Sequence, residues 1–156
     1  MRRLLAFVLL VTTLASIRAA EVELVRVWPG WRDEASFLRI SEYFGGKENT
    51  GDQIMLRTHA EARAGFYFLT RVKNSSGALS GAKFALHLIA PDSPEPKLYT
   101  FPADLAAGST VFQIGLTSTD WPGPKVHPVA WMLELVTADG RVLAAQKSFL
   151  WEKPAK

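Results

Sequence analysis

The stretch VAWMLELVTADGRVL, from Val129 to Leu143, decides the fold class that the sequence predicts. Apolar side chains recur at every second position of its first half, as they do in a half-buried β-strand. The residues on this apolar face are Val129, Trp131, Leu133 and Leu135. Asp139-Gly140 then favours a tight hairpin turn, because this pair accepts positive φ at little cost. Residues 141–151 are predicted to return as the partner strand, so the stretch predicts a β-hairpin with one buried face.

The same two-residue period occurs along most of the chain, in segments separated by turns rich in Gly, Pro and Asn. The predicted strands are residues 22–28, 53–58, 65–73, 82–90, 97–101, 110–117, 129–137 and 141–151. Short strands at this spacing are typical of a β-sandwich, in which two sheets bury their apolar faces against each other. We therefore expect an all-β fold of about seven to eight antiparallel strands. It forms one domain over residues 21–151, followed by a polar tail at residues 152–156.

The predicted closing hairpin resembles that of bacterial immunoglobulin-like and fibronectin-like domains. The resemblance rests on Trp131-Met132-Leu133-Glu134-Leu135, on Asp139-Gly140-Arg141-Val142-Leu143 and on Phe149. It implies an immunoglobulin-like sandwich and no particular activity. The chain departs from antibody-type domains because it contains no cysteine for the disulfide that joins their sheets. The whole chain also resembles exported proteins of environmental bacteria.

One segment, near residues 34–44, departs from the strand pattern. Phe37, Ile40 and Phe44 follow the spacing of a helix face. Asp33 can cap the start of this helix, and Gly45-Gly46 can end it. The sequence therefore predicts one short helix that lies over one end or one face of the sheets.

Residues 1–20 have the three-part layout of a secretory signal peptide. Arg2 and Arg3 form a charged start, residues 4–11 are apolar, and the segment ends in Ala19-Ala20. The alternative is an uncleaved membrane anchor, but the apolar run is shorter than the ~20 residues that a spanning helix needs. We expect cleavage after Ala19 or Ala20 and a mature protein that is periplasmic or secreted.

Removal of this segment changes the charge balance. The chain has 18 Lys and Arg against 15 Asp and Glu, and three of the basic residues (Arg2, Arg3 and Arg18) precede residue 21. The 15 basic residues that remain equal the 15 acidic ones, so the mature domain is nearly neutral. Its charges are mixed in sign and spread singly, whereas nucleic-acid binders cluster Lys and Arg on one face. We expect no nucleic-acid partner.

The sequence contains no recognisable catalytic or metal-binding motif. The histidines His59, His87 and His127 form none of the close pairs typical of zinc sites. His59 with Glu61 and Asp52 is a loop cluster that could converge on a metal, and a solvated connector is the simpler interpretation. There is also no Gly-x-Ser-x-Gly nucleophile motif. We expect no enzyme activity, no metal and no cofactor; a small hydrolase or metal-dependent enzyme is the third class of function considered.

Two Trp-Pro-Gly segments are the candidate binding elements. They are Trp28-Pro29-Gly30-Trp31 and Trp121-Pro122-Gly123-Pro124. A planar ring on a stiff turn can stack on a sugar or anchor a protein partner at small entropic cost. The alternative is that these tryptophans plug the open end of the sandwich. The predicted ligand-binding residues are Trp28, Trp31, Arg32, Tyr43 and Trp121.

These observations favour an exported, non-catalytic β-sandwich that binds a protein or cell-envelope partner. The alternative is a carbohydrate-binding module that uses the loop tryptophans as stacking platforms. An exposed row of planar rings would favour sugar binding, whereas a compact exposed apolar patch would favour a protein partner.

Overall fold

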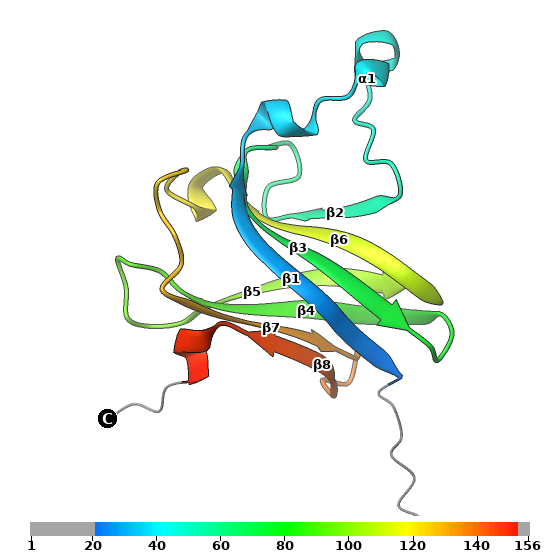
Figure 1. The fold of residues 1–156 in the computed structure, drawn as a ribbon, viewed down its shortest axis with the longest axis vertical. Helices are drawn as coiled ribbons and strands as arrows, with labels where there is room; N and C mark the ends of the chain where they lie inside the picture. Colours follow the sequence, from blue (N-terminus) through cyan, green and yellow to red (C-terminus); the bar gives the residue numbers. More distant parts are fainter. Residues whose placement is uncertain (1–20, 153–156) are drawn as a thin grey trace, which may run out of the picture.

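The computed structural model describes residues 21–152, so the predicted signal peptide and residues 153–156 of the predicted tail lie outside the described part. Within it the chain forms eight strands (Figure 1). They are β1 (Val22–Arg32), β2 (Gln53–Arg57), β3 (Gly65–Asn74), β4 (Leu79–Ile89), β5 (Lys97–Leu105), β6 (Gly108–Thr117), β7 (Ala130–Val136) and β8 (Val142–Lys147). Among residues 21–152, no helix has the length and apolar character of a membrane span.

The strands form two four-stranded sheets that pack face to face. Sheet A has the order β1-β3-β6-β2, and sheet B has the order β5-β4-β7-β8. In immunoglobulin domains strands A, B, E and D form one sheet and C, F and G the other. Here β1, β3 and β6 occupy the places of A, B and E, and β4, β7 and β8 occupy those of C, F and G. The predicted all-β, immunoglobulin-like sandwich is confirmed by this strand order.

Strand β2 departs from the prediction that all strands are antiparallel. It lies beside β6, in the place of strand D, but it pairs with β6 in parallel. The reason is its place in the chain: β2 belongs to the long connection between β1 and β3 and therefore reaches the sheet edge from the opposite direction to a normal strand D.

Strand β1 is longer than predicted. The sequence analysis ended it before Pro29-Gly30, but its pairing with β3 continues from Val22 to Arg32. Pro29 is tolerated because β1 is an edge strand, where a residue without an N–H group need not donate to a second neighbour. The segment Trp28-Pro29-Gly30-Trp31 is therefore part of a sheet, not a loop.

The core consists of aromatic and aliphatic side chains from the facing sides of both sheets. Phe112 of sheet A meets Phe84 of sheet B with ring centroids 5.0 Å apart, and Phe68 meets Trp131 at 5.4 Å. Phe68, Phe84 and Phe112 are completely buried. Buried rings of this size dominate the hydrophobic stabilisation of a domain, so the sandwich is held from inside.

The predicted helix near residues 34–44 is present only in pieces. Glu34–Phe37 forms a 3-10 turn (η1) and Ile40–Gly45 forms a short α-helix (α1), with extended backbone at Leu38 and Arg39 between them. Figure 1 shows this segment on the side of sheet A that faces away from sheet B, with α1 projecting clear of the strands, so the expectation that it lies over the sheets holds only for its first part.

Two further short helical turns complete the fold. Ser118–Asp120 (η2) follows β6, and Phe149–Glu152 (η3) follows β8. The last strand therefore ends at Lys147 and not near residue 151, as the sequence analysis predicted.

Candidate functional site

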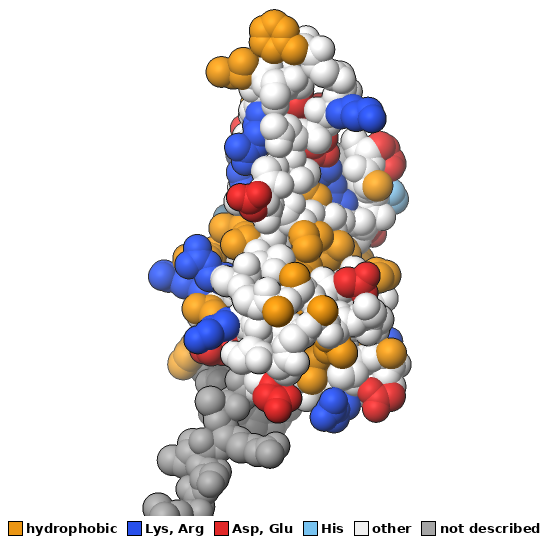
Figure 2. All heavy atoms as spheres, turned by 90° about the vertical axis from the view of Figure 1, so that its right-hand side faces the viewer, with side chains coloured by type: hydrophobic (Ala, Val, Ile, Leu, Met, Phe, Trp, Pro, Cys, Tyr) orange, Lys and Arg blue, Asp and Glu red, His pale blue; other side chains and the backbone are white. Residues whose placement is uncertain are grey.

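The most exposed apolar side chains of the described residues lie on the projecting segment Leu38–Lys47, which we call the tip. Ile40 is 79% exposed, Tyr43 78% and Phe44 89%, and Leu38 is half exposed beside them. Figure 2 shows apolar side chains gathered at the far end of the molecule. Single exposed apolar residues are common on protein surfaces, but a group at the end of a projection is typical of an interaction site.

Local hydrogen bonds explain why the tip adopts this shape. The Asp33 carboxylate accepts the backbone N–H of Ser36 at 2.9 Å and caps η1, as predicted. Gly46, with φ of 65°, ends α1 and donates its N–H to the Glu42 carbonyl. The Asn49 side chain then closes the loop, because it donates to the Ser41 hydroxyl at 2.9 Å.

The tip is joined to sheet A by a network of charged groups that we call the brace: Glu42, Glu48, Arg57, Arg63 and Tyr67. The Arg57 side chain, at the end of β2, is 4% exposed and donates two hydrogen bonds to the Glu48 carboxylate, at 2.8 and 2.6 Å. Its Nε donates to the Tyr67 hydroxyl at 2.7 Å, and that hydroxyl donates to the Arg63 carbonyl at 2.7 Å. A two-point arginine–carboxylate pair is among the strongest and most directional contacts in proteins.

A second ion pair in the brace holds α1 itself. Arg63, in the loop between β2 and β3, donates to Glu42 at 2.7 Å and lies 3.8 Å from Glu48. The hydrogen bond from Arg63 lowers the pKa of Glu42, and the hydrogen bonds from Arg57 lower that of Glu48. Both carboxylates are therefore charged at neutral pH, and the pKa of the Arg57 guanidinium is raised, mainly by Glu48.

Phe37 secures the base of the tip on the outer face of sheet A. Its ring lies 4.9 Å from the ring of Tyr67, and the guanidinium groups of Arg32 and Arg57 lie 4.5 and 5.1 Å from its centre. Tyr67 lies flat on the sheet because the neighbouring residue on β6 is Gly115, where a Cβ would come within 2.7 Å of Tyr67 Cζ. The apolar end of the tip is exposed, whereas its base is fixed to the sandwich.

The structure does not bring the five predicted ligand-binding residues together. Trp121 is buried against Phe66, with centroids 5.0 Å apart, and donates to the Val126 carbonyl, so the alternative in which it plugs the sandwich is correct. Trp31 packs against the core, and Trp28 is partly exposed under Arg26. Arg32 follows Trp31 in β1, but its guanidinium lies over Phe37 at the base of the tip, and Tyr43 lies near the end of the tip.

The histidines form pairs with carboxylates but no larger cluster. His59 lies 3.1 Å from Asp120 rather than beside Glu61 and Asp52, and His87 lies 3.0 Å from Glu134 across β4 and β7. His87 is half-buried in this pair. Within residues 21–152, no three His, Asp or Glu side chains are arranged to hold a metal ion.

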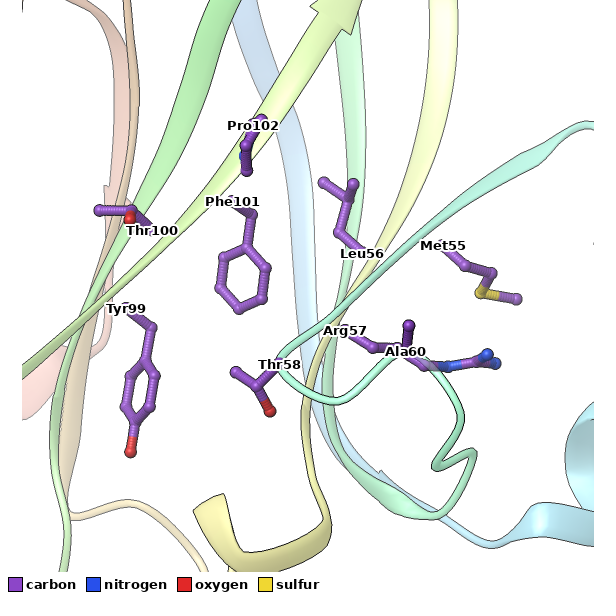
Figure 3. A pocket seen from close by; sticks show the side chains of 9 residues that line it. All are labelled: Met55, Leu56, Arg57, Thr58, Ala60, Tyr99, Thr100, Phe101 and Pro102. Atoms are coloured by element: carbon purple, nitrogen blue, oxygen red, sulfur yellow. The ribbon is translucent and has the colours of Figure 1, made fainter.

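A side opening of about 380 Å³ lies where the free edges of the two sheets face each other. Figure 3 shows Leu56 of β2 and Phe101 of β5 pointing into the space between the strands, with Tyr99 below them. Arg57 points away from this opening and toward the brace. The opening exposes part of the apolar interior but contains no group of converging charges.

Comparisons with known proteins concern the fold alone. No protein-family model matches the chain, and no curated protein matches it at a significant level. A similar solved structure is that of an immunoglobulin-like protein from Pseudomonas aeruginosa, 16% identical, with a TM-score of 0.34. The match covers 82% of this chain and 94% of that one.

Sequence reasoning missed the brace. The sequence analysis assigned no role to Arg57, Arg63 or Glu42. Arg57 and Glu48 are nine residues apart, and Arg63 and Glu42 are twenty-one apart, so no local spacing rule connects them. The sequence offers one signal for this network: Arg57 occupies an outward-facing position of a short predicted strand, and an acidic loop precedes that strand.

Proposed function

We propose that this protein is an exported, non-catalytic β-sandwich that binds a protein or cell-envelope partner through its tip. The observation that supports this proposal is the exposure of Ile40, Tyr43 and Phe44 at the end of a segment whose base is held by the brace. Grouped exposed apolar side chains reduce solubility, so their presence on a folded protein usually marks an interaction site. A segment that is already fixed loses less conformational entropy when it binds.

A protein with an apolar groove fits the tip better than other partners. Tyr and other large side chains that enter a pocket are the usual anchors of protein interfaces, and the tip offers Tyr43 and Phe44 within one short helix. Beside Tyr43 lies a shallow hollow of about 180 Å³, lined also by Leu38, Glu42 and Gly46, that can receive a partner side chain. The tip can therefore insert its apolar side chains into a partner and receive an apolar side chain from that partner.

The carbohydrate-binding alternative has less support. A stacking platform needs exposed planar rings, and Trp121 is 4% exposed while Trp31 packs against the core. Trp28 has an accessible edge, but Arg26 lies over its ring at 4.5 Å. No row of rings is available for a sugar chain among the three tryptophans on which that alternative depends.

Export is part of the proposal and is supported by the layout of residues 1–20. Expression of the full chain in a bacterium, followed by N-terminal sequencing of the protein recovered outside the cytoplasm, tests it. A mature start at Ala20 or Glu21 is expected, and a cytoplasmic protein that still begins at Met1 would contradict export.

Site-specific crosslinking in the native cells tests the use of the tip. A photoreactive phenylalanine analogue replaces Tyr43 in one strain and Leu98 in a control strain; Leu98 is 57% exposed on β5, on the other sheet. We expect one discrete protein adduct from position 43 and none of that size from position 98. The same adducts from both positions, or none from position 43, would argue against the proposal.

A variant of the tip separates binding from folding. Ile40→Ser with Phe44→Ser removes two exposed groups, so the free energy of unfolding is expected to stay within about 0.5 kcal/mol of the wild type. The adduct from position 43 is expected to disappear in this background. Co-sedimentation of the purified domain with lipid vesicles, lost in the same variant, would instead assign the tip to a membrane surface.

A further inference from the structure

A second cavity, of about 280 Å³, lies beneath the base of the tip on the outer face of sheet A. Gln53 and Met55 of β2 and Gln113 of β6 line it from the sheet, and Phe37 and Asn49 line it from the tip side. Arg32 and Arg39 also line it. It is smaller than most sites for drug-sized molecules, so its size suits a small metabolite.

Gln113 in this cavity carries an unsatisfied polar atom. The residue is 2% exposed, and its Nε2 donates to Gln53 Oε1 at 2.7 Å. Its own Oε1 is buried and accepts no hydrogen bond from residues 21–152. Buried acceptors of this kind are rare and costly, so a rotation of the Gln113 amide that presents this oxygen to a donor group on a ligand would be favourable. Gln146 carries the other such oxygen, and it lines neither this cavity nor the side opening.

The two arginines give the cavity a positive charge. Within residues 21–152, neither Arg32 nor Arg39 forms an ion pair, and no carboxylate lines the cavity. Arg32 makes only long contacts, of 3.4 Å, with Ser36 and lies over the Phe37 ring. The guanidinium of Arg39 lies close to Gly51, at the start of the turn into β2.

Three acidic groups around the tip are already paired with other residues. Glu42 pairs with Arg63, Glu48 pairs with Arg57, and the Asp33 carboxylate accepts the N–H of Ser36. They do not neutralise Arg32 or Arg39 by direct contact. The cavity therefore combines two available guanidinium groups with one buried acceptor.

We propose that this cavity binds a small hydroxylated carboxylate. The carboxylate accepts hydrogen bonds from Arg32 and Arg39, for which guanidinium groups are well suited. A hydroxyl group of the same molecule donates to Gln113 Oε1 once the amide has turned toward the cavity, and the Gln53 amide, whose Nε2 makes no hydrogen bond within the described residues, donates to a further oxygen. This site shares Leu38 and Arg39 with the base of the tip but none of the exposed side chains Ile40, Tyr43 and Phe44, so it does not depend on the proposed protein partner.

Calorimetric titration of the purified mature domain tests the proposal. The probes are D-glucuronate, D-gluconate and L-tartrate, each of which has a carboxylate and hydroxyl groups. D-Glucose lacks the carboxylate and succinate lacks the hydroxyls, so both serve as matched comparisons. We expect at least one hydroxy acid to bind and both comparison compounds to bind about tenfold more weakly or not at all.

Variants then locate the binding. Arg39→Gln changes an exposed residue and is expected to weaken binding about tenfold, whereas Arg71→Gln, an exposed arginine on β3 that lines no described cavity, leaves it unchanged. Gln113→Leu is expected to weaken the binding of the hydroxy acid more than the binding of succinate. Failure of all three acids to bind, equal binding of glucose, or binding that Arg39→Gln leaves unchanged would each overturn the proposal.

Discussion

The sandwich and the tip treat large apolar side chains in opposite ways. Phe68 and Phe112 are fully buried between the sheets, whereas Phe44 is 89% exposed at the end of the tip. The sandwich is stabilised by apolar burial, but the tip is held by ion pairs and hydrogen bonds at its base. The core aromatics stabilise the fold, whereas the tip aromatics stay exposed, as the proposed partner requires.

The largest expected effect comes from the sandwich. Phe112→Ala removes a buried ring that contacts Phe84 and is expected to lower the free energy of unfolding by about 3–5 kcal/mol. Denaturant unfolding of the purified domain measures this change. A loss as small as that of the tip variant Phe44→Ser would contradict the division of roles between the two regions.

The next effect concerns the brace. Arg57→Met removes the guanidinium that pairs with Glu48 and is expected to cost about 1.5–3 kcal/mol, because a hydrogen-bonded buried charge is lost. Hydrogen exchange should speed up in residues 40–48 and stay slow in β3 and β6. Arg71→Met, at an exposed position of β3, is the matched control and is expected to change neither quantity.

Gly115→Ala tests the packing of the Tyr67 ring against Gly115 of β6. An added methyl group overlaps the Tyr67 ring, so the ring must shift away from Arg57, at an expected cost of about 1–3 kcal/mol. Gly30→Ala is the control, because Gly30 lies opposite Tyr67 on β1 and has open space for a methyl group. Thermal unfolding of both variants should separate them; equal Tm values would exclude a role for this contact.

Acid is expected to release the tip before it unfolds the sandwich. Arg63 and Arg57 lower the pKa values of Glu42 and Glu48 below those of an unfolded chain. The charged carboxylates therefore add stability above about pH 4.3, and this contribution is lost as the pH falls through their lowered pKa values. Amide resonances of residues 42–48 should broaden in that range while those of β6 remain sharp. Simultaneous loss of both sets would show that the tip is not a separate unit.

Much of the sandwich was predictable because strand alternation and turn residues are local features of the sequence. Alternation in segments such as Val129–Leu143 follows from one buried and one exposed face, and Gly140, with φ of 86°, allows the turn that closes between Thr137 and Arg141. The parallel pairing of β2 was not predictable, because it depends on the path of the whole connection from β1 to β3. Chain path decides pairing direction, and no residue pattern records it.

The sequence predicted a short helix near residues 34–44 and named Tyr43, but the projection of the tip escaped prediction for a different reason. Phe37, Ile40 and Phe44 have the spacing of a helix face that packs on a core, but extended backbone at Leu38-Arg39 turns α1 away after Phe37 has reached Tyr67. Trp121 shows the reverse case: a tryptophan beside a stiff turn was a candidate for exposure and is buried. In both places long-range contacts, which local spacing does not encode, determine which side chains remain available.

Backbone order at the tip tests most directly the claim that an exposed apolar group is held ready for a partner. Nitrogen-15 relaxation of the free domain measures the order parameter at Tyr43 and Phe44. We predict values near 0.85, as in the sheets, and a fall in Arg57→Met. Values below about 0.6 in the wild-type protein would contradict the account, because the brace would then not fix the tip.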